Sequence, residues 1–217
     1  MIHSSAFVLP RIYPLTDVQL SGLSHADQIE SLSLGGATLI QLREKQMPAL
    51  QFYEQAKAAM GVATRGGLTI IINDRVDVAL AVGAHGVHLG QDDIPPEAAR
   101  QLLGREAIIG YSTHNVDQAK SALDLPIDYL AVGPIFDTAT KTDTSPALGL
   151  EGLRGVRRAI GNVPLVAIGG ISRANAGDVI AAGADSVAVI SALLSDPQRI
   201  TEVTRTLIDS LSPIRPT

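Results

Sequence analysis

The stretch Leu68-Thr69-Ile70-Ile71-Ile72, followed directly by Asn73-Asp74-Arg75, is the strongest indication of the fold in this 217-residue chain. The run is short and apolar at nearly every position, so neither side of a strand built from it could face water. Strands buried on both sides are typical of parallel sheets covered by helices. We therefore expect a parallel strand over 68–72, with polar side chains emerging at its carboxyl end.

Seven further runs of similar length and composition occur along the chain. The polar or small residues that end successive runs are 18 to 35 residues apart, which is longer than the roughly ten to twelve residues that a parallel crossover needs. The predicted strands are 12–15, 38–42, 68–72, 86–89, 107–109, 129–132, 164–168 and 186–190.

The segments between these runs have helical spacing. Apolar residues separated by steps of three and four lie on one face of a helix. This spacing is clearest in two sets, Leu150, Leu153, Val156 and Ile160, and later Ile200, Val203 and Leu207.

Eight alternating strands and helices, without a linker or a change in composition, predict an α/β fold of one domain. The length suits a single (β/α)8 TIM barrel over residues 1–217, with the barrel at about 11–209 and a short tail at 210–217. An open doubly wound sheet is the alternative. No G-x-G-x-x-G motif follows the first strand, so a dinucleotide site in such a sheet has no support.

Composition and charge exclude several classes of protein. The chain has 17 Lys and Arg against 22 Asp and Glu, a formal charge of −5, which disfavours nucleic acid and anionic membranes as partners. It has no cysteine, hence no disulfide, thiolate metal site or cysteine nucleophile. No apolar run reaches the length of a membrane span, and the first residues do not resemble a signal peptide. We expect a soluble, cytoplasmic protein, with a homo-oligomer left open.

A barrel of this kind carries its site at the carboxyl ends of the strands. The second predicted strand ends in Gln41-Leu42-Arg43-Glu44-Lys45, and alternation would send Gln41, Arg43 and Lys45 to one side. A guanidinium and an ammonium together suit a phosphate or diphosphate. The alternative is a solvated loop in which Glu44 pairs with its neighbours.

Carboxylates follow two adjacent strands, Asp74 after the third and Asp92 and Asp93 after the fourth. Mg2+ commonly takes one or two protein carboxylates and completes its coordination with water and phosphate oxygens. We therefore predict an Mg2+ site made by Asp74 together with Asp92 or Asp93. Each Asp alone could equally cap the helix that follows it.

His85 and His88 do not predict a zinc site, because three residues along a strand place the two rings on opposite faces. Ser112 and His114 end the fifth strand and could supply a hydroxyl and an imidazole to the site, or only a turn.

The longest loop, 133–149, carries Thr138, Thr140 and Lys141 and is expected to be either a lid ordered by substrate or an ordinary surface loop. After the seventh and eighth strands, Gly169-Gly170 and Ile190-Ser191 predict a phosphate site, where backbone N–H groups can approach an anion.

Taken together, these motifs resemble the thiamine-phosphate synthase (thiamine-phosphate pyrophosphorylase) family, from about Tyr13 to Ser191. Each motif alone is unspecific, but the full set of motifs, in this order and at the spacing of barrel strands, is specific for the family. The motifs that carry the resemblance are Gln41-Leu42-Arg43-Glu44-Lys45, Asn73-Asp74-Arg75, His88 to Asp93, Gly110 to His114, Gly133-Pro134 with Thr138, Thr140 and Lys141, Gly169-Gly170, and Val189-Ile190-Ser191.

The resemblance implies a transferase that joins an aminopyrimidine methyl diphosphate to a thiazole phosphate, giving thiamine phosphate and pyrophosphate. It implies Mg2+ bound by Asp74 and Asp93, and Arg43, Lys45, Ser112 and Lys141 as catalytic residues. The pyrimidine and its diphosphate would be held by Gln41, Arg43, Lys45, Asn73, Ser112 and Lys141. The thiazole phosphate would be held by Thr138, Thr140, Gly170, Ile190 and Ser191.

Three other functions fit parts of the pattern. A thiazole tautomerase-like isomerase would bind the thiazole phosphate but would not need Arg43, Lys45, Asp74 and Asp93 together. A non-catalytic regulator that binds thiazole phosphate would be expected to have degraded catalytic positions. An aldolase would need Lys45 or Lys141 in an apolar pocket as a Schiff-base lysine.

Overall fold

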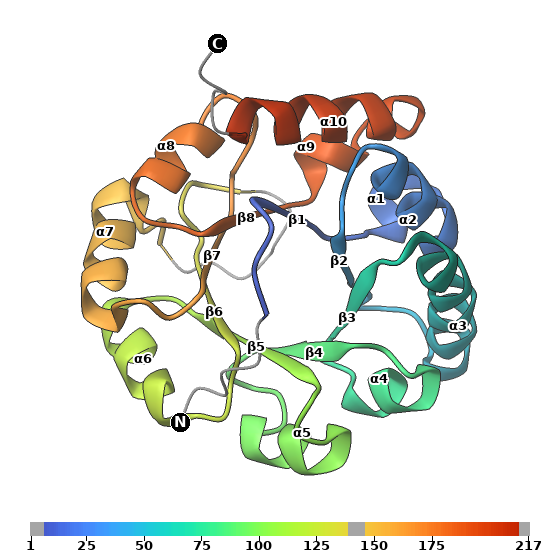
Figure 1. Cartoon of the computed structure of the whole chain (residues 1–217), viewed down its shortest axis with the longest axis horizontal. Helices are drawn as coiled ribbons and strands as arrows, with labels where there is room; N and C mark the ends of the chain where they lie inside the picture. Colours follow the sequence, from blue (N-terminus) through green and yellow to red (C-terminus); the bar gives the residue numbers. More distant parts are fainter. Residues whose placement is uncertain (1–6, 139–145, 213–217) are drawn as a thin grey trace.

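The computed structural model of the chain describes residues 7–138 and 146–212, and its strands form the centre of a ring of helices (Figure 1). Eight parallel strands make one sheet in the order β1-β8-β7-β6-β5-β4-β3-β2. This order confirms the predicted barrel. The strands are β1 (Ile12–Pro14), β2 (Leu39–Leu42), β3 (Thr69–Asn73), β4 (Gly86–Leu89), β5 (Ile108–Thr113), β6 (Tyr129–Val132), β7 (Leu165–Ile168) and β8 (Ser186–Val189).

The sheet closes between β1 and β2. Leu15 forms a parallel bridge with Gln41, and the Thr16 N–H donates to the Gln41 carbonyl at 2.9 Å. On its other side β1 pairs with β8, with Tyr13 opposite Ala188. Because the first strand joins the second to the eighth, the sheet is a barrel and the open doubly wound alternative is wrong.

The helices pack outside the strands, and those predicted from spacing are present. Leu153, Val156 and Ile160 are buried residues of α7, and Ile200 and Leu207 are buried residues of α10. No helix in the described part of the chain combines the length and apolar character that crossing a membrane requires. The helices are α1 (Val18–Ser21), α2 (His25–Leu34), α3 (Ala49–Gly66), α4 (Val76–Val82), α5 (Pro96–Leu103), α6 (Val116–Ser121), α7 (Gly149–Ile160), α8 (Ala176–Ala181), α9 (Ser191–Leu194) and α10 (Ile200–Leu211), with 3-10 turns η1 (Ala122–Asp124) and η2 (Pro197–Arg199).

The strand β5 is longer than its sequence predicts. The apolar run suggests 107–109, but the ladder continues to Thr113, because Gly110 to Thr113 pair with Tyr129 to Val132 of β6. Gly110 and the three residues that follow it do not continue the apolar run, so the sequence pattern does not predict this extension. Backbone pairing with β6 holds these residues in the strand. The extension places Ser112 inside the strand and close to the mouth of the barrel.

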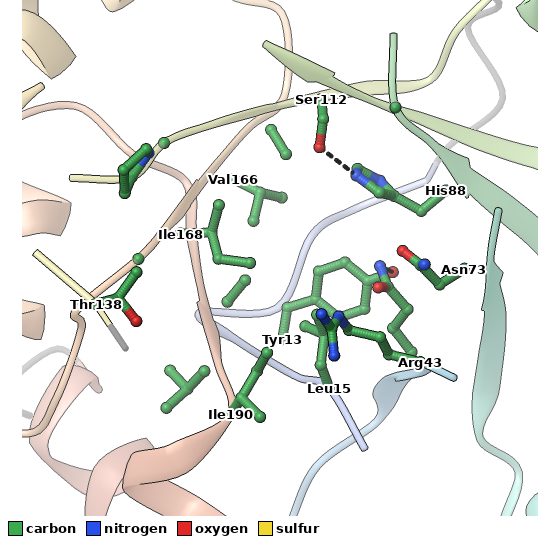
Figure 2. Close-up of a pocket in the computed structure, with 18 of the residues that line it drawn as sticks. Tyr13, Leu15, Arg43, Asn73, His88, Ser112, Thr138, Val166, Ile168 and Ile190 are labelled. Carbon is green, nitrogen blue, oxygen red and sulfur yellow. Dashed lines mark hydrogen bonds between the residues drawn. The ribbon is translucent and has the colours of Figure 1, made fainter. Parts of the chain in front are cut away.

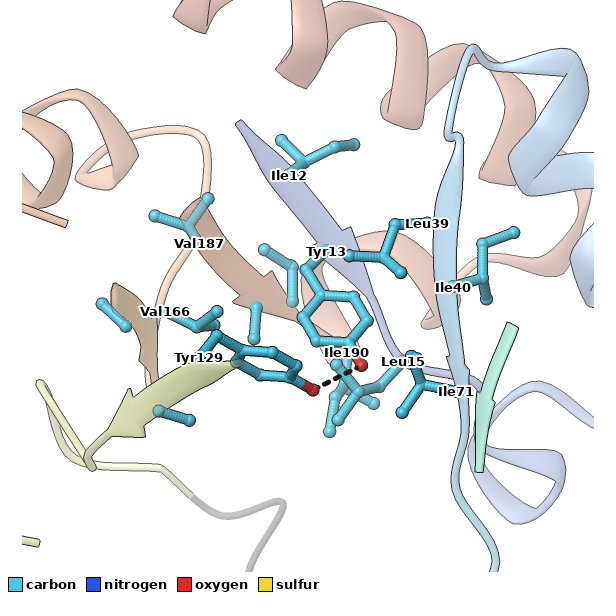
Figure 3. Packing of buried hydrophobic residues seen from close by; sticks show 14 of the residues in the cluster. Ile12, Tyr13, Leu15, Leu39, Ile40, Ile71, Tyr129, Val166, Val187 and Ile190 are labelled. Atoms are coloured by element: carbon cyan, nitrogen blue, oxygen red, sulfur yellow. Dashed lines mark hydrogen bonds between the residues drawn. The ribbon is translucent and has the colours of Figure 1, made fainter. Parts of the chain in front are cut away.

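Two tyrosines fill the interior of the barrel in a chain that has few aromatic residues. The hydroxyls of Tyr13 and Tyr129 are 3.0 Å apart, and their rings meet edge to face with centroids separated by 5.9 Å (Figure 3). Apolar side chains from other strands, including Leu39 and Val166, pack around them. Both tyrosines are fully buried, so their hydroxyls must hydrogen bond inside the protein.

Gly110 leaves the space that Tyr129 occupies. A Cβ at this position would lie 2.0 Å from Cζ of Tyr129, 2.3 Å from its hydroxyl and 2.5 Å from Nδ1 of His88. The phenol therefore lies across the position that a side chain on β5 would take. A glycine inside a strand often marks such a close approach.

The substitution Gly110→Ala should destabilise the protein by about 1–3 kcal/mol or more, because a methyl group in this packed interior forces the Tyr129 ring or the strands to move. Urea unfolding measures this change in free energy. The control is Gly177→Ala in α8, where a Cβ meets nothing within 4 Å and helix propensity predicts a gain of about 0.5–1 kcal/mol. Equal stability of the two variants would contradict the close packing of Tyr129 against Gly110.

His25, the first residue of α2, is buried against the closing seam of the barrel. Its Nδ1 is 2.7 Å from the Thr16 hydroxyl, and its Nε2 has no hydrogen-bond partner. Burial lowers the pKa of His25 to about 4, although Glu44 and Asp17 act in the opposite direction. The folded protein therefore holds a neutral imidazole at a position where the unfolded chain would titrate near 6.5.

This buried imidazole makes the protein less stable as the pH falls. Its stabilising contribution is fully present above about pH 6.5 and is lost towards pH 4, because the unfolded chain takes up the proton first. Between pH 7 and pH 4.5 the loss attributable to His25 should be about 2–3 kcal/mol. Comparing urea unfolding of the wild type and of His25→Asn isolates it, since the asparagine can still reach Thr16 but does not titrate. The same pH dependence in both proteins would exclude His25 as the source.

Candidate functional site

A cavity of about 360 Å³ opens at the carboxyl ends of the strands (Figure 2). Every predicted site residue that the structure describes lines it, whichever strand the residue follows. Thr140 and Lys141 lie outside the described residues. The predicted residues in the cavity lining are Gln41, Arg43, Lys45, Asn73, Asp74, Asp93, Ser112, Thr138, Gly170, Ile190 and Ser191.

The two cations after β2 are positioned by a loop and not by strand alternation. β2 ends at Leu42, and the carboxylate of Glu44 then accepts hydrogen bonds from the N–H groups of Lys45, Gln46 and Met47 at 2.8 to 3.2 Å. The loop is folded around Glu44, and Arg43 and Lys45 line the cavity. The Arg43 guanidinium is mostly buried and pairs with Asp17 at 3.3 Å.

Asp74 and Asp93 lie at the mouth of the cavity, and neither caps a helix. The N-cap positions of α4 and α5 belong to Arg75 and Pro95. Asp74 has a left-handed backbone, with φ of 62°, and is the one described residue other than glycine with a positive φ. Aspartate tolerates this conformation better than most residues, and such outliers cluster at functional sites.

The charges around these two carboxylates are not balanced. Lys45 Nζ is 2.5 Å from Oδ2 of Asp74, and Oδ2 of Asp93 accepts the Gly90 N–H at 2.7 Å. Burial and the neighbouring Asp74 carboxylate raise the pKa of Asp93, against the effect of the Gly90 N–H and of Lys45. One Lys thus faces two carboxylates. Within residues 7–138 and 146–212, no three His, Cys, Asp or Glu side chains are grouped as metal ligands.

Two buried amides in the cavity lining each have an unused hydrogen-bonding atom. Gln41 and Asn73 come from the neighbouring strands β2 and β3, and both are almost fully buried. Oε1 of Gln41 and Nδ2 of Asn73 have no partner. An acceptor and a donor that are buried without partners cost free energy, which a ligand with matching polar atoms would recover.

The opposite side of the cavity is formed by the loops after β6, β7 and β8. In Figure 2, Thr138, Ile168 and Ile190 lie in the left half of the view, and Asn73 and His88 lie in the right half. Gly170 has φ of 64°, and a Cβ there would lie 2.7 Å from the carbonyl oxygen of Asp137. Glycine is required at this position because the loops after β6 and β7 pack closely together.

His114 also lines the cavity, and its ring holds the end of β6. Nδ1 of His114 is 2.6 Å from the carbonyl oxygen of Gly133. Because a carbonyl can only accept, Nδ1 carries the proton in this contact.

Four residues that shape the site are not among those predicted from the sequence. Asp17 pairs with Arg43. His88 contacts Ser112, with Nε2 and Oγ 2.8 Å apart, and Tyr129, with Nδ1 and the hydroxyl 3.0 Å apart. The hydroxyl of Tyr13, the fourth of these residues, contacts the hydroxyl of Tyr129. A glycine inside a strand, Gly110, and tyrosines within apolar strands are the sequence features that could have indicated these contacts. The contacting residues lie far apart in the chain, so the sequence pattern does not show which residues meet.

Comparison with known proteins agrees with this arrangement. The family model described as thiamine monophosphate synthase matches residues 12–193. The thiamine-phosphate synthase of Albidiferax ferrireducens is 50% identical over 214 residues, 97% of each chain. That of Chloroflexus aurantiacus is 50% identical over 186 residues, 85% of each chain.

Solved structures show the same relationship. The thiamine phosphate pyrophosphorylase of Pyrococcus furiosus is 37% identical, with a TM-score of 0.81 over 93% of this chain and 96% of that one. A structure described as native KDPGal has a TM-score of 0.73 over 97% of each chain, but at 13% identity this likeness shows the fold alone. The match to the family model and the identity to its curated relatives over nearly the whole chain show that this chain belongs to the thiamine-phosphate synthase family.

Proposed function

We propose that this chain is a cytoplasmic transferase that joins an aminopyrimidine methyl diphosphate to a thiazole phosphate, with release of pyrophosphate and formation of thiamine phosphate. The observation that carries the proposal is the cavity itself. One wall has buried amides beside Arg43 and Lys45, and the other has the glycine and hydroxyl groups of three strand ends. Such a cavity can hold two anionic substrates with their reacting atoms between the walls.

The buried amides suit the aminopyrimidine. Oε1 of Gln41 has no partner and can accept a hydrogen bond from an exocyclic amino group. Nδ2 of Asn73 has no partner either and can donate to a ring nitrogen or to the diphosphate. A site with polar groups of this kind discriminates strongly against ligands that leave them unpaired.

Arg43 and Lys45 would receive the diphosphate. Both already pair with a carboxylate, Arg43 with Asp17 and Lys45 with Asp74. These pairs hold the cations in place before substrate arrives, so little reorganisation is needed when negative charge develops on the leaving group. Lys141, which the resemblance assigns to the same role, lies outside the described residues.

Asp74 and Asp93 fit an Mg2+ ion. Their two carboxylates lie together with one Lys, and burial, followed by the neighbouring Asp74 carboxylate, raises the pKa of Asp93. Two carboxylates suffice, because Mg2+ keeps water and phosphate oxygens as its other ligands. When bound, the ion would supply positive charge to the pyrophosphate that leaves.

The reaction needs no protein nucleophile. The C–O bond between the methylene carbon and the diphosphate breaks, and a C–N bond to the thiazole nitrogen forms. An electron-rich aminopyrimidine stabilises positive charge on the methylene, so we expect a dissociative substitution. The protein then contributes orientation of the two rings and stabilisation of the leaving diphosphate by Arg43 and Lys45.

Thr138, Gly170, Ile190 and Ser191 would hold the thiazole phosphate. α9 begins at Ser191, one residue after β8 ends. The N–H groups of Leu193 and Leu194 both donate to the Ile190 carbonyl, and the N–H groups that precede them, at Ser191 and Ala192, have no carbonyl partner within the helix. Thr138 and Ser191 add hydroxyl groups on the same side of the cavity.

The alternative functions agree less well with the geometry. A thiazole tautomerase would leave the wall of Arg43, Lys45, Asp74 and Asp93 without a ligand. Lys45 does not suit Schiff-base chemistry either, because a Schiff-base lysine needs an apolar pocket, whereas the Lys45 side chain is half-exposed and its Nζ pairs with the Asp74 carboxylate.

Incubation of the protein with both substrates and Mg2+ should give thiamine phosphate and pyrophosphate in equal amounts, and EDTA should abolish product. Chromatography with a coupled pyrophosphate assay measures both. Undiminished product in EDTA would remove Mg2+ from the proposal. Isomerisation of a thiazole carboxylate without condensation would favour the tautomerase.

The substitution Asp93→Asn should lower the rate by about 10²–10³ and raise the Mg2+ concentration needed for half-maximal rate, because it removes one preorganised charged group. The neighbouring Asp92→Asn is the matched comparison: Asp92 also lines the cavity but is exposed, and it should retain near wild-type kinetics if Asp93 is the ligand. Steady-state rates at increasing Mg2+ measure both effects. Two variants with equal kinetics would contradict the assignment to Asp93.

A further inference from the structure

A continuous chain of hydrogen bonds crosses the floor of the cavity from Gln41 to Ser112. Nε2 of Gln41 donates to the Tyr13 hydroxyl at 3.1 Å, and this hydroxyl is 3.0 Å from that of Tyr129. The Tyr129 hydroxyl is 3.0 Å from Nδ1 of His88. Nε2 of His88 is 2.8 Å from Oγ of Ser112, and Figure 2 shows this last contact. The chain thus joins β2 to β5 through the interior of the barrel.

The protons along this chain can be assigned in one direction. Burial raises the pKa of both phenols, so each hydroxyl keeps its proton and can donate once. Because Nε2 of Gln41 donates to Tyr13, both phenol protons find an acceptor along this chain only when Tyr13 donates to Tyr129 and Tyr129 donates to Nδ1 of His88. A neutral imidazole then carries its proton on Nε2 and donates to Ser112. The hydroxyl proton of Ser112 is left for the cavity.

The reverse direction requires every member to change together. If the Gln41 amide turned over, Tyr13 would donate to Oε1, the remaining donors would reverse, and Ser112 would donate to Nε2 of His88. Gln41 would then present N–H and Ser112 a lone pair to the cavity. In the observed arrangement Gln41 presents an acceptor, because its Oε1 is buried without a partner. The two ends therefore cannot change independently.

We propose that Tyr13, Tyr129 and His88 form a relay that sets the hydrogen-bonding character of Gln41 and Ser112 together and so determines which pyrimidine the cavity accepts. The inference rests on the proposed function and deepens it. A 4-aminopyrimidine offers an amino N–H and a ring lone pair, which match an acceptor at Gln41 and a donor at Ser112. A 4-oxo pyrimidine offers a carbonyl oxygen and a ring N–H, which is the opposite pattern. The relay residues act through Gln41 and Ser112 and are positioning residues.

Gly110 makes this relay sterically possible. A side chain at that position would overlap the Tyr129 hydroxyl and Nδ1 of His88, which are the atoms of the central contact. The absence of a side chain in β5 is thus a requirement of the relay as well as of packing.

The test compares kcat/KM for the amino and the 4-oxo pyrimidine methyl diphosphates, each with thiazole phosphate and Mg2+. The wild type should prefer the amino substrate by about 10³ or more. Tyr129→Phe removes the central hydroxyl, so Gln41 can turn over, and the preference should fall by about tenfold or more. Intrinsic differences in reactivity between the substrates cancel when this ratio is compared between proteins. Tyr53→Phe in α3, outside the cavity, is the matched control and should leave the ratio unchanged.

A second variant guards against a general loss of structure. His88→Gln keeps a polar group near Ser112, but its amide can present either N–H or C=O, so the preference should again fall. A merely structural role would lower kcat/KM for both substrates equally and leave the ratio unchanged in both variants, which would overturn the relay. Failure of the wild type to use the amino substrate would instead overturn the proposed function.

Discussion

The backbone hydrogen bond from Thr16 to Gln41 joins the first strand to the second and closes the sheet, and the site depends on this closure. In an open sheet the ends of β2 and β8 would lie at opposite edges. In the closed barrel both border one cavity, so the cations after β2 and the residues after β8 line the same site. The buried His25 contacts the Thr16 hydroxyl beside this closing hydrogen bond. The group expected to make stability depend on pH therefore lies where the barrel closes.

The distribution of charge explains how an acidic protein can bind two anions. The net charge of −5 describes the whole surface, whereas the substrates would meet a small group of cations in a partly enclosed cavity, where charges interact more strongly than in water. Arg43 and Lys45 are each paired with an aspartate before any substrate binds. Both pairs hold the cations in position, and the pair with Asp17 also limits the cost of burying Arg43.

The interior tyrosines connect the packing of the core to the residues of the site. Their rings occupy the space that an aromatic-poor set of Ala, Val, Ile and Leu side chains leaves inside the barrel. Their hydroxyls must then find partners, because a buried hydroxyl without one is costly. The partners available are Gln41 and His88, both of which line the cavity. The need to satisfy buried polar atoms in the core therefore extends to the residues that would contact substrate.

The sequence by itself determined the barrel and most of the candidate site, because both follow from local patterns. Apolar runs separated by crossover-length segments specify parallel strands, and in such a fold polar residues at strand ends meet at one mouth. Only the tertiary structure decided how those residues are held: that Arg43 pairs with Asp17, that Glu44 shapes its loop, and that β5 continues to Thr113. It alone revealed the contacts among Tyr13, Tyr129 and His88, since these residues are separated by 41 and 116 positions in the chain. The periodicity of a strand shows which face a side chain occupies, whereas its partner across the barrel is set by closure and register.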